Sequence, residues 1–113
     1  MSNELSQSSC EACRLDAPVL SEQEIKELSP QIPSWIVHEE DGIKRLICSF
    51  AFSSYEDSVN FTNKVAELAE QEDHHPEIVL EWGNVTVSWW SHKIKGLHKN
   101  DFICASKTDD LFK

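Results

Sequence analysis

The sequence predicts an α+β fold, a four-stranded antiparallel sheet with three helices packed on one face. Two pairs of short segments alternate between apolar and polar residues, and each pair is joined by a tight-turn signal, Asp41-Gly42 or Gly83-Asn84. A long amphipathic segment separates the two pairs, and shorter helical segments lie before and after them. Because these helices are too few to connect parallel strands, we expect the strands to pair antiparallel.

The first helix is predicted to begin at Ser21 and to end before Pro30. Ser21 and Glu24 form the sequence pattern of a capping box, and the residue before a proline disfavours helical geometry. One strand is expected at residues 35–38. A second is expected at residues 44–52, where apolar and polar side chains alternate.

The longest helix is predicted over residues 55–71, with Ser53 or Ser54 as its N-cap. Apolar residues recur along it at helical spacing, which predicts a face that packs on the core. The centre of that face is the stripe Tyr55, Val59, Thr62, Ala66 and Ala69, widened by Phe61, Val65 and Leu68.

The second strand pair is predicted to be a β-hairpin with Gly83-Asn84 as its two-residue turn. Only one register places the apolar residues of both strands on a single face. The residues paired in it are Trp82 with Val85, Leu80 with Val87, and Ile78 with Trp89. A final helix is expected at residues 100–111.

Composition limits the classes of partner. We expect a polar N-terminal extension, residues 1–18, and a single domain, residues 19–113. A net charge of −10 and a pI of about 4.8 argue against nucleic acid and anionic membranes as partners, because both need a clustered basic surface. The first residues lack the features of a secretory signal, and no apolar stretch is long enough to span a bilayer, so a cytoplasmic location is expected.

The cysteines do not predict a metal or redox site. Cys10 and Cys13 form a CxxC pair, but no second pair of ligands completes a zinc site around them. We interpret this pair as reduced, incidental thiols, and the sequence does not specify a role for it. Cys48 and Cys104 are the other two cysteines.

Three histidines carry the strongest chemical signal. His74 and His75 follow an acidic segment containing Glu70, and the predicted hairpin register sets His75 opposite His92. His74 is expected in the loop between helix and strand, so that three imidazoles converge at one end of the hairpin. With carboxylates beside them, such rings can supply an acid and a base in one pocket.

Two other interpretations remain open for these residues. The histidines could be solvated loop residues, with His74 capping the backbone. Three histidines could also bind zinc, although adjacent histidines chelate poorly from an extended backbone.

The motif around the histidines resembles that of the pterin-4a-carbinolamine dehydratases. Its residues are Glu70-x3-His74-His75-Pro76, then Trp82, then His92-x3-Gly96-Leu97-x3-Asp101. The resemblance implies a hydro-lyase, a 4a-hydroxytetrahydrobiopterin dehydratase, that converts 4a-hydroxytetrahydropterin to quinonoid dihydropterin and water. It also implies that neither a metal nor an organic cofactor takes part.

The resemblance also implies roles for single residues. His74 and His92 would be the acid and base, and His75 would complete the catalytic set by positioning the substrate. Glu70 and Asp101 would be supporting residues, Asp101 as the helix-capping partner of His98, unless Asn100 takes over as the cap. The substrate-binding residues would be Trp35, Asp73, Trp90, Ser91 and Lys93.

The same resemblance bears on partners. It implies a homodimer or homotetramer that acts on a pterin carbinolamine and supports an aromatic amino-acid hydroxylase. The alternative is a protein-binding or regulatory module that acts on phenylalanine hydroxylase or its expression. The sequence does not specify the side chain of the pterin.

Overall fold

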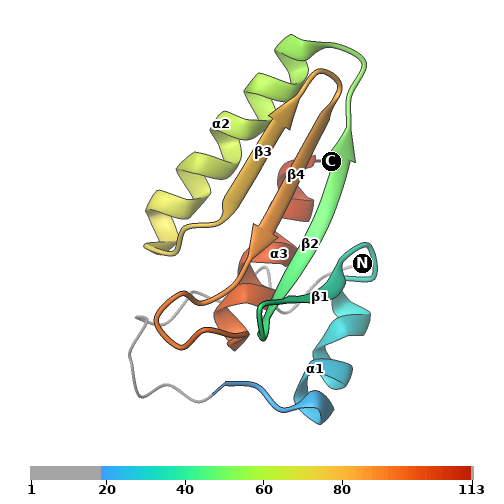
Figure 1. Ribbon diagram of the computed structural model, residues 1–113. Helices are drawn as coiled ribbons and strands as arrows, with labels where there is room; N and C mark the ends of the chain where they lie inside the picture. The colour runs from blue at the N-terminus through green and yellow to red at the C-terminus, as the bar shows by residue number, and fades with distance from the viewer. Residues whose placement is uncertain (1–18, 113) are drawn as a thin grey trace.

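The computed structural model describes residues 19–112 and confirms the α+β fold (Figure 1). The strands form one antiparallel sheet in the order β1-β2-β4-β3. In chain order the elements are α1 (Glu22–Leu28), the 3-10 turn η2 (Ser29–Gln31), β1 (Ile36–Glu40), β2 (Ile43–Ala51), α2 (Tyr55–Glu72), β3 (Glu77–Glu81), β4 (Asn84–Trp89) and α3 (Lys99–Phe112). The predicted extension, with Cys10 and Cys13, lies outside the described residues.

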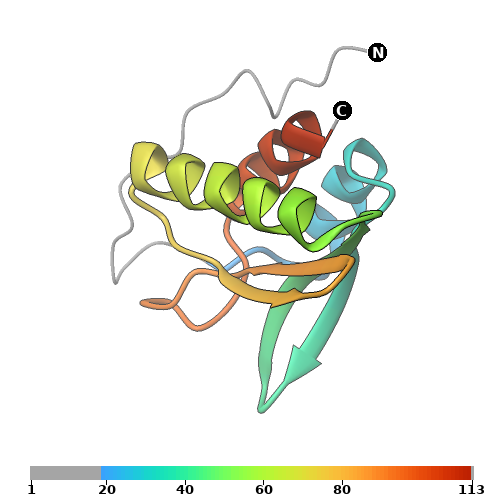
Figure 2. The same ribbon diagram turned by 90° about the horizontal axis from the view of Figure 1, so that it is seen from above.

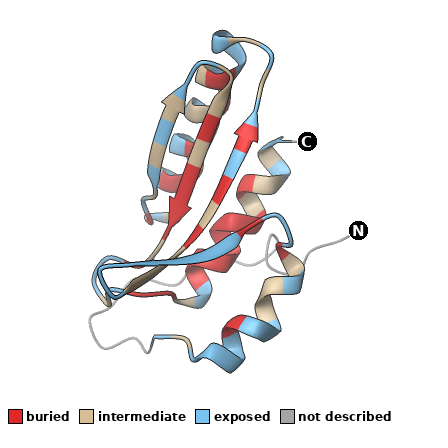
Figure 3. Ribbon diagram, turned by 45° about the vertical axis from the view of Figure 1, so that its right-hand side comes forward, coloured by how far each residue is buried: buried red, intermediate tan, exposed pale blue. Residues whose placement is uncertain are grey.

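The helices lie on one side of the sheet, and no described helix covers its other face (Figure 2). Buried residues concentrate on β4, on alternate positions of β2 and on α3 (Figure 3). The core is therefore a single layer between helices and sheet, and the uncovered face carries the other set of alternating side chains.

Local signals set the helix starts as predicted. At α1, Ser21 Oγ accepts from the Glu24 amide at 3.2 Å, and the Glu24 carboxylate accepts from the Ser21 amide at 2.8 Å. This confirms the capping box. The α-helical geometry ends at Leu28, and Pro30 lies in the 3-10 turn that follows. Ser54 caps α2 by accepting from the Asp57 amide at 3.1 Å.

The predicted stripe of α2 is only partly correct. Tyr55 is 49% exposed and Ala66 is exposed as well. The face that packs on the core is centred on Phe61, whose ring lies 4.8 Å from that of Phe50 and 5.2 Å from that of Phe52 between centroids. The buried residues of the helix are Ser58, Phe61, Val65, Leu68 and Ala69.

The hairpin register differs from the prediction by two residues. Leu80 pairs with Val85 and Ile78 with Val87, so the two-residue turn is Trp82-Gly83. Gly83 has a φ of +73°, and its carbonyl accepts from the Phe52 amide at 2.9 Å, which fixes the turn against the end of β2. A shift by two residues preserves the face of each side chain, so Ile78 and Leu80 still lean against the core.

Both edges of the sheet carry carboxylates. All five residues of β1 are exposed, and its last two are Glu39 and Glu40. On the opposite edge, β3 begins and ends with the exposed residues Glu77 and Glu81. Among residues 19–112, the two edge strands that pair on one side only are thus lined with negative charge.

Cys48 and Cys104 are buried and take part in no disulfide. Burial, with a smaller effect from the charge of Asp109, raises the pKa of Cys48 to about 11. At neutral pH this thiol therefore stays protonated, and a protonated, buried thiol is unreactive. No helix among residues 19–112 is long and apolar enough to cross a membrane.

The two turn glycines give a matched test of the hairpin geometry. Gly83→Ala should lower the free energy of unfolding by about 2 kcal/mol, because the new Cβ combines a positive φ with a contact 3.1 Å from the Phe52 carbonyl oxygen. Gly42→Ala should cost about 1 kcal/mol, because its φ is +79° but nothing lies within 4 Å of its Cβ. Urea unfolding of both variants measures the difference. Equal losses would contradict a specific contact between the turn and β2.

Candidate functional site

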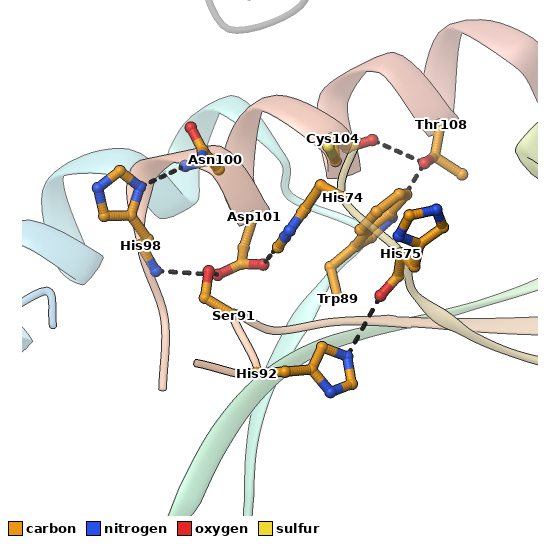
Figure 4. Close-up of polar contacts among 10 residues, drawn as sticks. All are labelled: His74, His75, Trp89, Ser91, His92, His98, Asn100, Asp101, Cys104 and Thr108. Carbon is orange, nitrogen blue, oxygen red and sulfur yellow. Dashed lines mark hydrogen bonds and ion pairs between the residues drawn. The ribbon is translucent and has the colours of Figure 1, made fainter. Parts of the chain in front are cut away.

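The candidate site lies where the end of α2, the end of β4 and the start of α3 meet (Figure 4). Asp73 ends α2 in the left-handed conformation, with a φ of +52°, and its amide donates to the carbonyls of Ala69 and Glu70. The His74 amide also donates to the Ala69 carbonyl, at 3.1 Å. This turn reverses the chain and directs His74 toward α3.

The His74 ring is held on the core side of the sheet. Its side chain is 5% exposed, and Nε2 lies 2.6 Å from Asp101 Oδ1. The ring stacks on the Trp89 indole at 5.5 Å between centroids, with an angle of 16° between planes. Because a carboxylate accepts, Nε2 carries the proton. Nδ1 makes no hydrogen bond within residues 19–112 and is the atom left to exchange a proton.

Asp101 is fully buried and accepts three hydrogen bonds. Besides His74 Nε2, its carboxylate accepts from Ser91 Oγ at 2.9 Å and from the His98 amide at 2.9 Å. His98 Nδ1 in turn accepts from the Asn100 amide at 3.1 Å. Asp101 is therefore the capping partner of His98, as predicted, and His98 itself caps α3 in place of Asn100. The sequence did not predict that the same carboxylate also holds His74.

His75 and His92 lie on the exposed side. His75 Nε2 is 2.7 Å from Glu70 Oε2, with both side chains exposed. His92 Nε2 donates to the His75 carbonyl at 3.3 Å, and its ring lies 4.5 Å from that of Trp90 between centroids. Both rings are thus protonated at Nε2, as in His74, because each partner is an acceptor only.

The three histidines lie at one end of the hairpin but do not form one cluster. His74 stacks on Trp89, which faces the core, whereas His92 packs on Trp90, the next residue. Trp89 is the last residue of β4 and Trp90 is the first residue after it, so the two rings contact different indoles at the end of the strand. The predicted direct pairing of His75 with His92 is wrong, because the hairpin register differs from the predicted one. His92 instead contacts the backbone carbonyl of His75. Within residues 19–112, no group of three or more His, Cys, Asp or Glu side chains is arranged to hold a metal ion.

The other predicted site residues divide into two groups. Asp73, Trp90 and Lys93 lie beside the histidines in the chain, and Asp73 and Lys93 are exposed. Ser91 is fully buried and directed at Asp101. The structure does not bring Trp35 to the histidines. Its Nε1 donates to Asp109 Oδ1 at 2.8 Å, about 12 Å further along α3 than Asp101.

Comparison with known proteins gives a consistent family. A family model described as "Pterin 4 alpha carbinolamine dehydratase" matches residues 18–111. Proteins of Nitrosococcus oceani and Photobacterium profundum are both 57% identical, over 97% and 96% of each chain, and both are named "Putative pterin-4-alpha-carbinolamine dehydratase".

A solved structure is also similar. The crystal structure of a transcriptional coactivator/pterin dehydratase from Brucella melitensis matches with a TM-score of 0.76 and 27% identity. The match covers 85% of this chain and all of that one.

The left-handed turn at Asp73 can be tested by replacement. Asp73→Gly should raise the free energy of unfolding by about 1 kcal/mol, because glycine adopts a positive φ without strain and the negative charge leaves a helix C-terminus. Asp73→Asn removes only the charge and should give about half that gain. Urea unfolding measures both. Destabilisation by either change would mean that the carboxylate makes a stabilising contact.

Proposed function

This chain belongs to the pterin 4 alpha carbinolamine dehydratase family, and from that premise we propose that His74 and His92 perform the two proton transfers of the family's reaction. The protein is a hydro-lyase that dehydrates 4a-hydroxytetrahydropterin. The C4a–oxygen bond breaks, the leaving hydroxyl takes a proton and departs as water, and a ring N–H gives up a proton. Protons balance and no electrons are transferred, so an acid and a base suffice.

The observation that carries the proposal is the buried hydrogen bond between His74 and Asp101. The carboxylate fixes the ring by binding Nε2–H, so that Nδ1 is free to accept a proton. A buried aspartate behind an imidazole also balances the positive charge that forms on the ring during transfer. We therefore assign His74 as the base that takes the ring N–H proton.

His92 is assigned as the acid. Its ring is exposed and its Nε2–H donates to the His75 carbonyl, so Nδ1 is the atom left to give a proton. In this role the ring starts as an imidazolium and returns to the neutral form when the leaving hydroxyl takes the Nδ1 proton. His75, joined to Glu70, is assigned to substrate positioning. Because the two reacting rings contact different indoles where β4 ends, we propose that the substrate binds across this end of the strand and meets each ring at a different atom.

Further proposals concern the setting of the reaction. We propose that the quinonoid product returns to an aromatic amino-acid hydroxylase. We also propose that the protein is a homodimer or homotetramer, and gel filtration with light scattering tests this oligomeric state. The cytoplasmic location remains a prediction. The comparisons do not favour the alternative, a regulatory module acting on phenylalanine hydroxylase.

Single histidine variants test the assignment of roles. His74→Ala and His92→Ala should each lower kcat by about 10²–10⁴-fold, the usual contribution of a positioned acid or base. His75→Ala should mainly raise KM. The measurement is a stopped assay on chemically generated 4a-hydroxytetrahydropterin, repeated with EDTA, which should change nothing. Unchanged kcat in the His74 and His92 variants would refute the assignment.

Asp101→Asn tests the orientation of His74 separately from folding. The amide oxygen can still accept from Ser91 and His98, but the amide NH2 would face His74 Nε2 and impose the opposite tautomer. We expect kcat to fall by about 10²–10⁴-fold while urea unfolding changes little. The matched variant Asp101→Ala removes all three acceptor contacts and should lower the free energy of unfolding by about 3 kcal/mol. Wild-type kcat in Asp101→Asn would exclude the orienting role.

A further inference from the structure

A row of three stacked side chains crosses the uncovered face of the sheet and ends at His92. We call Arg45, Trp90 and His92 the stacked row. The Arg45 guanidinium carbon lies 4.0 Å from the centroid of the Trp90 ring, and the Trp90 and His92 ring centroids are 4.5 Å apart with planes 34° apart. Leu46 of β2 pairs with Trp89, the last residue of β4, so Arg45 lies beside Trp90, the residue that follows β4.

Arg45 is held mainly by the indole. Its side chain is 14% exposed, and its Nε is buried without a hydrogen-bond partner in the described part of the chain. An ion pair joins its Nη1 to Glu77 Oε1, but at 3.7 Å and with Glu77 54% exposed this pair contributes little. A guanidinium is weakly hydrated and stacks on aromatic faces, so the Trp90 ring is the contact that explains its position.

The His92 ring has weak support from elsewhere. It is exposed, and its hydrogen bond to the His75 carbonyl is long, at 3.3 Å. The intervening residue, Ser91, is directed inward at Asp101 and lies away from the stacked row. The orientation of His92 therefore depends on the face that Trp90 presents to it.

We propose that Arg45 is a positioning residue for the dehydration: by fixing the Trp90 indole, it holds His92 in the orientation for proton transfer. The proposal rests on the proposed role of His92. It names a residue outside the histidine motif, on a strand far from it in sequence, as part of the same site. A misplacement of a reacting group by about 1 Å can lower a rate 10²-fold, so loss of the guanidinium should be visible in turnover.

Three variants separate positioning from charge and from folding. Arg45→Met keeps the aliphatic stem but removes the cation, and Arg45→Lys restores the cation without the planar group. Lys44→Met is the matched control, because it removes one positive charge from the adjacent residue of β2, whose ammonium lies 4.0 Å from Glu22. For each variant, kcat and KM are measured, and the His92 Cε1–H resonance is recorded by NMR as a report on its contact with the Trp90 ring.

Arg45→Met should lower kcat by about tenfold with little change in KM. This loss is smaller than the 10²–10⁴-fold contribution of a positioned acid, because His92 is still present but less well oriented. The His92 resonance should move toward its value in an unfolded peptide. Arg45→Lys should recover part of both effects, and Lys44→Met should resemble wild type. In a His92→Ala background, Arg45→Met should cause no further loss.

Two results overturn the proposal in distinguishable ways. If His92→Ala lowers kcat but Arg45→Met changes neither kcat nor the His92 resonance, or if the two losses multiply in the double variant, Arg45 does not act through His92. If His92→Ala itself turns over normally, the proposed role of His92 fails, and the positioning role of Arg45 fails with it.

Discussion

The buried carboxylate of Asp101 is the constraint on which the rest of the site depends. It joins three parts of the chain, because it accepts from His74 after α2, from Ser91 after β4 and from the His98 amide at the start of α3. A fully buried carboxylate is tolerated only when its oxygens are occupied by donors. The three element ends are therefore held together by one group, and His74 is oriented by the contact that begins α3.

The dipeptide Trp89-Trp90 supports two different rings of the site at the end of β4. The fully buried Trp89 stacks on His74, and the half-buried Trp90 packs on the exposed His92. Trp89 is anchored by donating from Nε1 to Thr108 on α3 at 3.1 Å, whereas Trp90 is covered by Arg45 from β2. The His74 ring thus stacks on a buried indole that is fixed by a hydrogen bond, whereas the His92 ring packs on an indole at the surface.

The sequence was sufficient for features that depend on local rules. The capping box at Ser21, the length of α2 and the inward face of the hairpin follow from spacing, and the partnership of Asp101 with His98 follows from the family resemblance. Features set by distant residues were missed. The turn at Trp82-Gly83 is fixed by the Phe52 amide, and His74 is held in the interior by Asp101, 27 residues later in the chain. Arg45 meets Trp90 only because β2 pairs with β4, which hairpin spacing does not reveal.

The carboxylates along the two sheet edges affect how copies of the protein behave toward one another. At neutral pH, like charges on β1 and β3 repel any second strand that approaches the unpaired backbone. At a pH near the pI of about 4.8, the net charge of the whole chain approaches zero, and the net repulsion between copies falls with it. The charge that keeps copies of the protein apart therefore also protects the edge strands from strand addition.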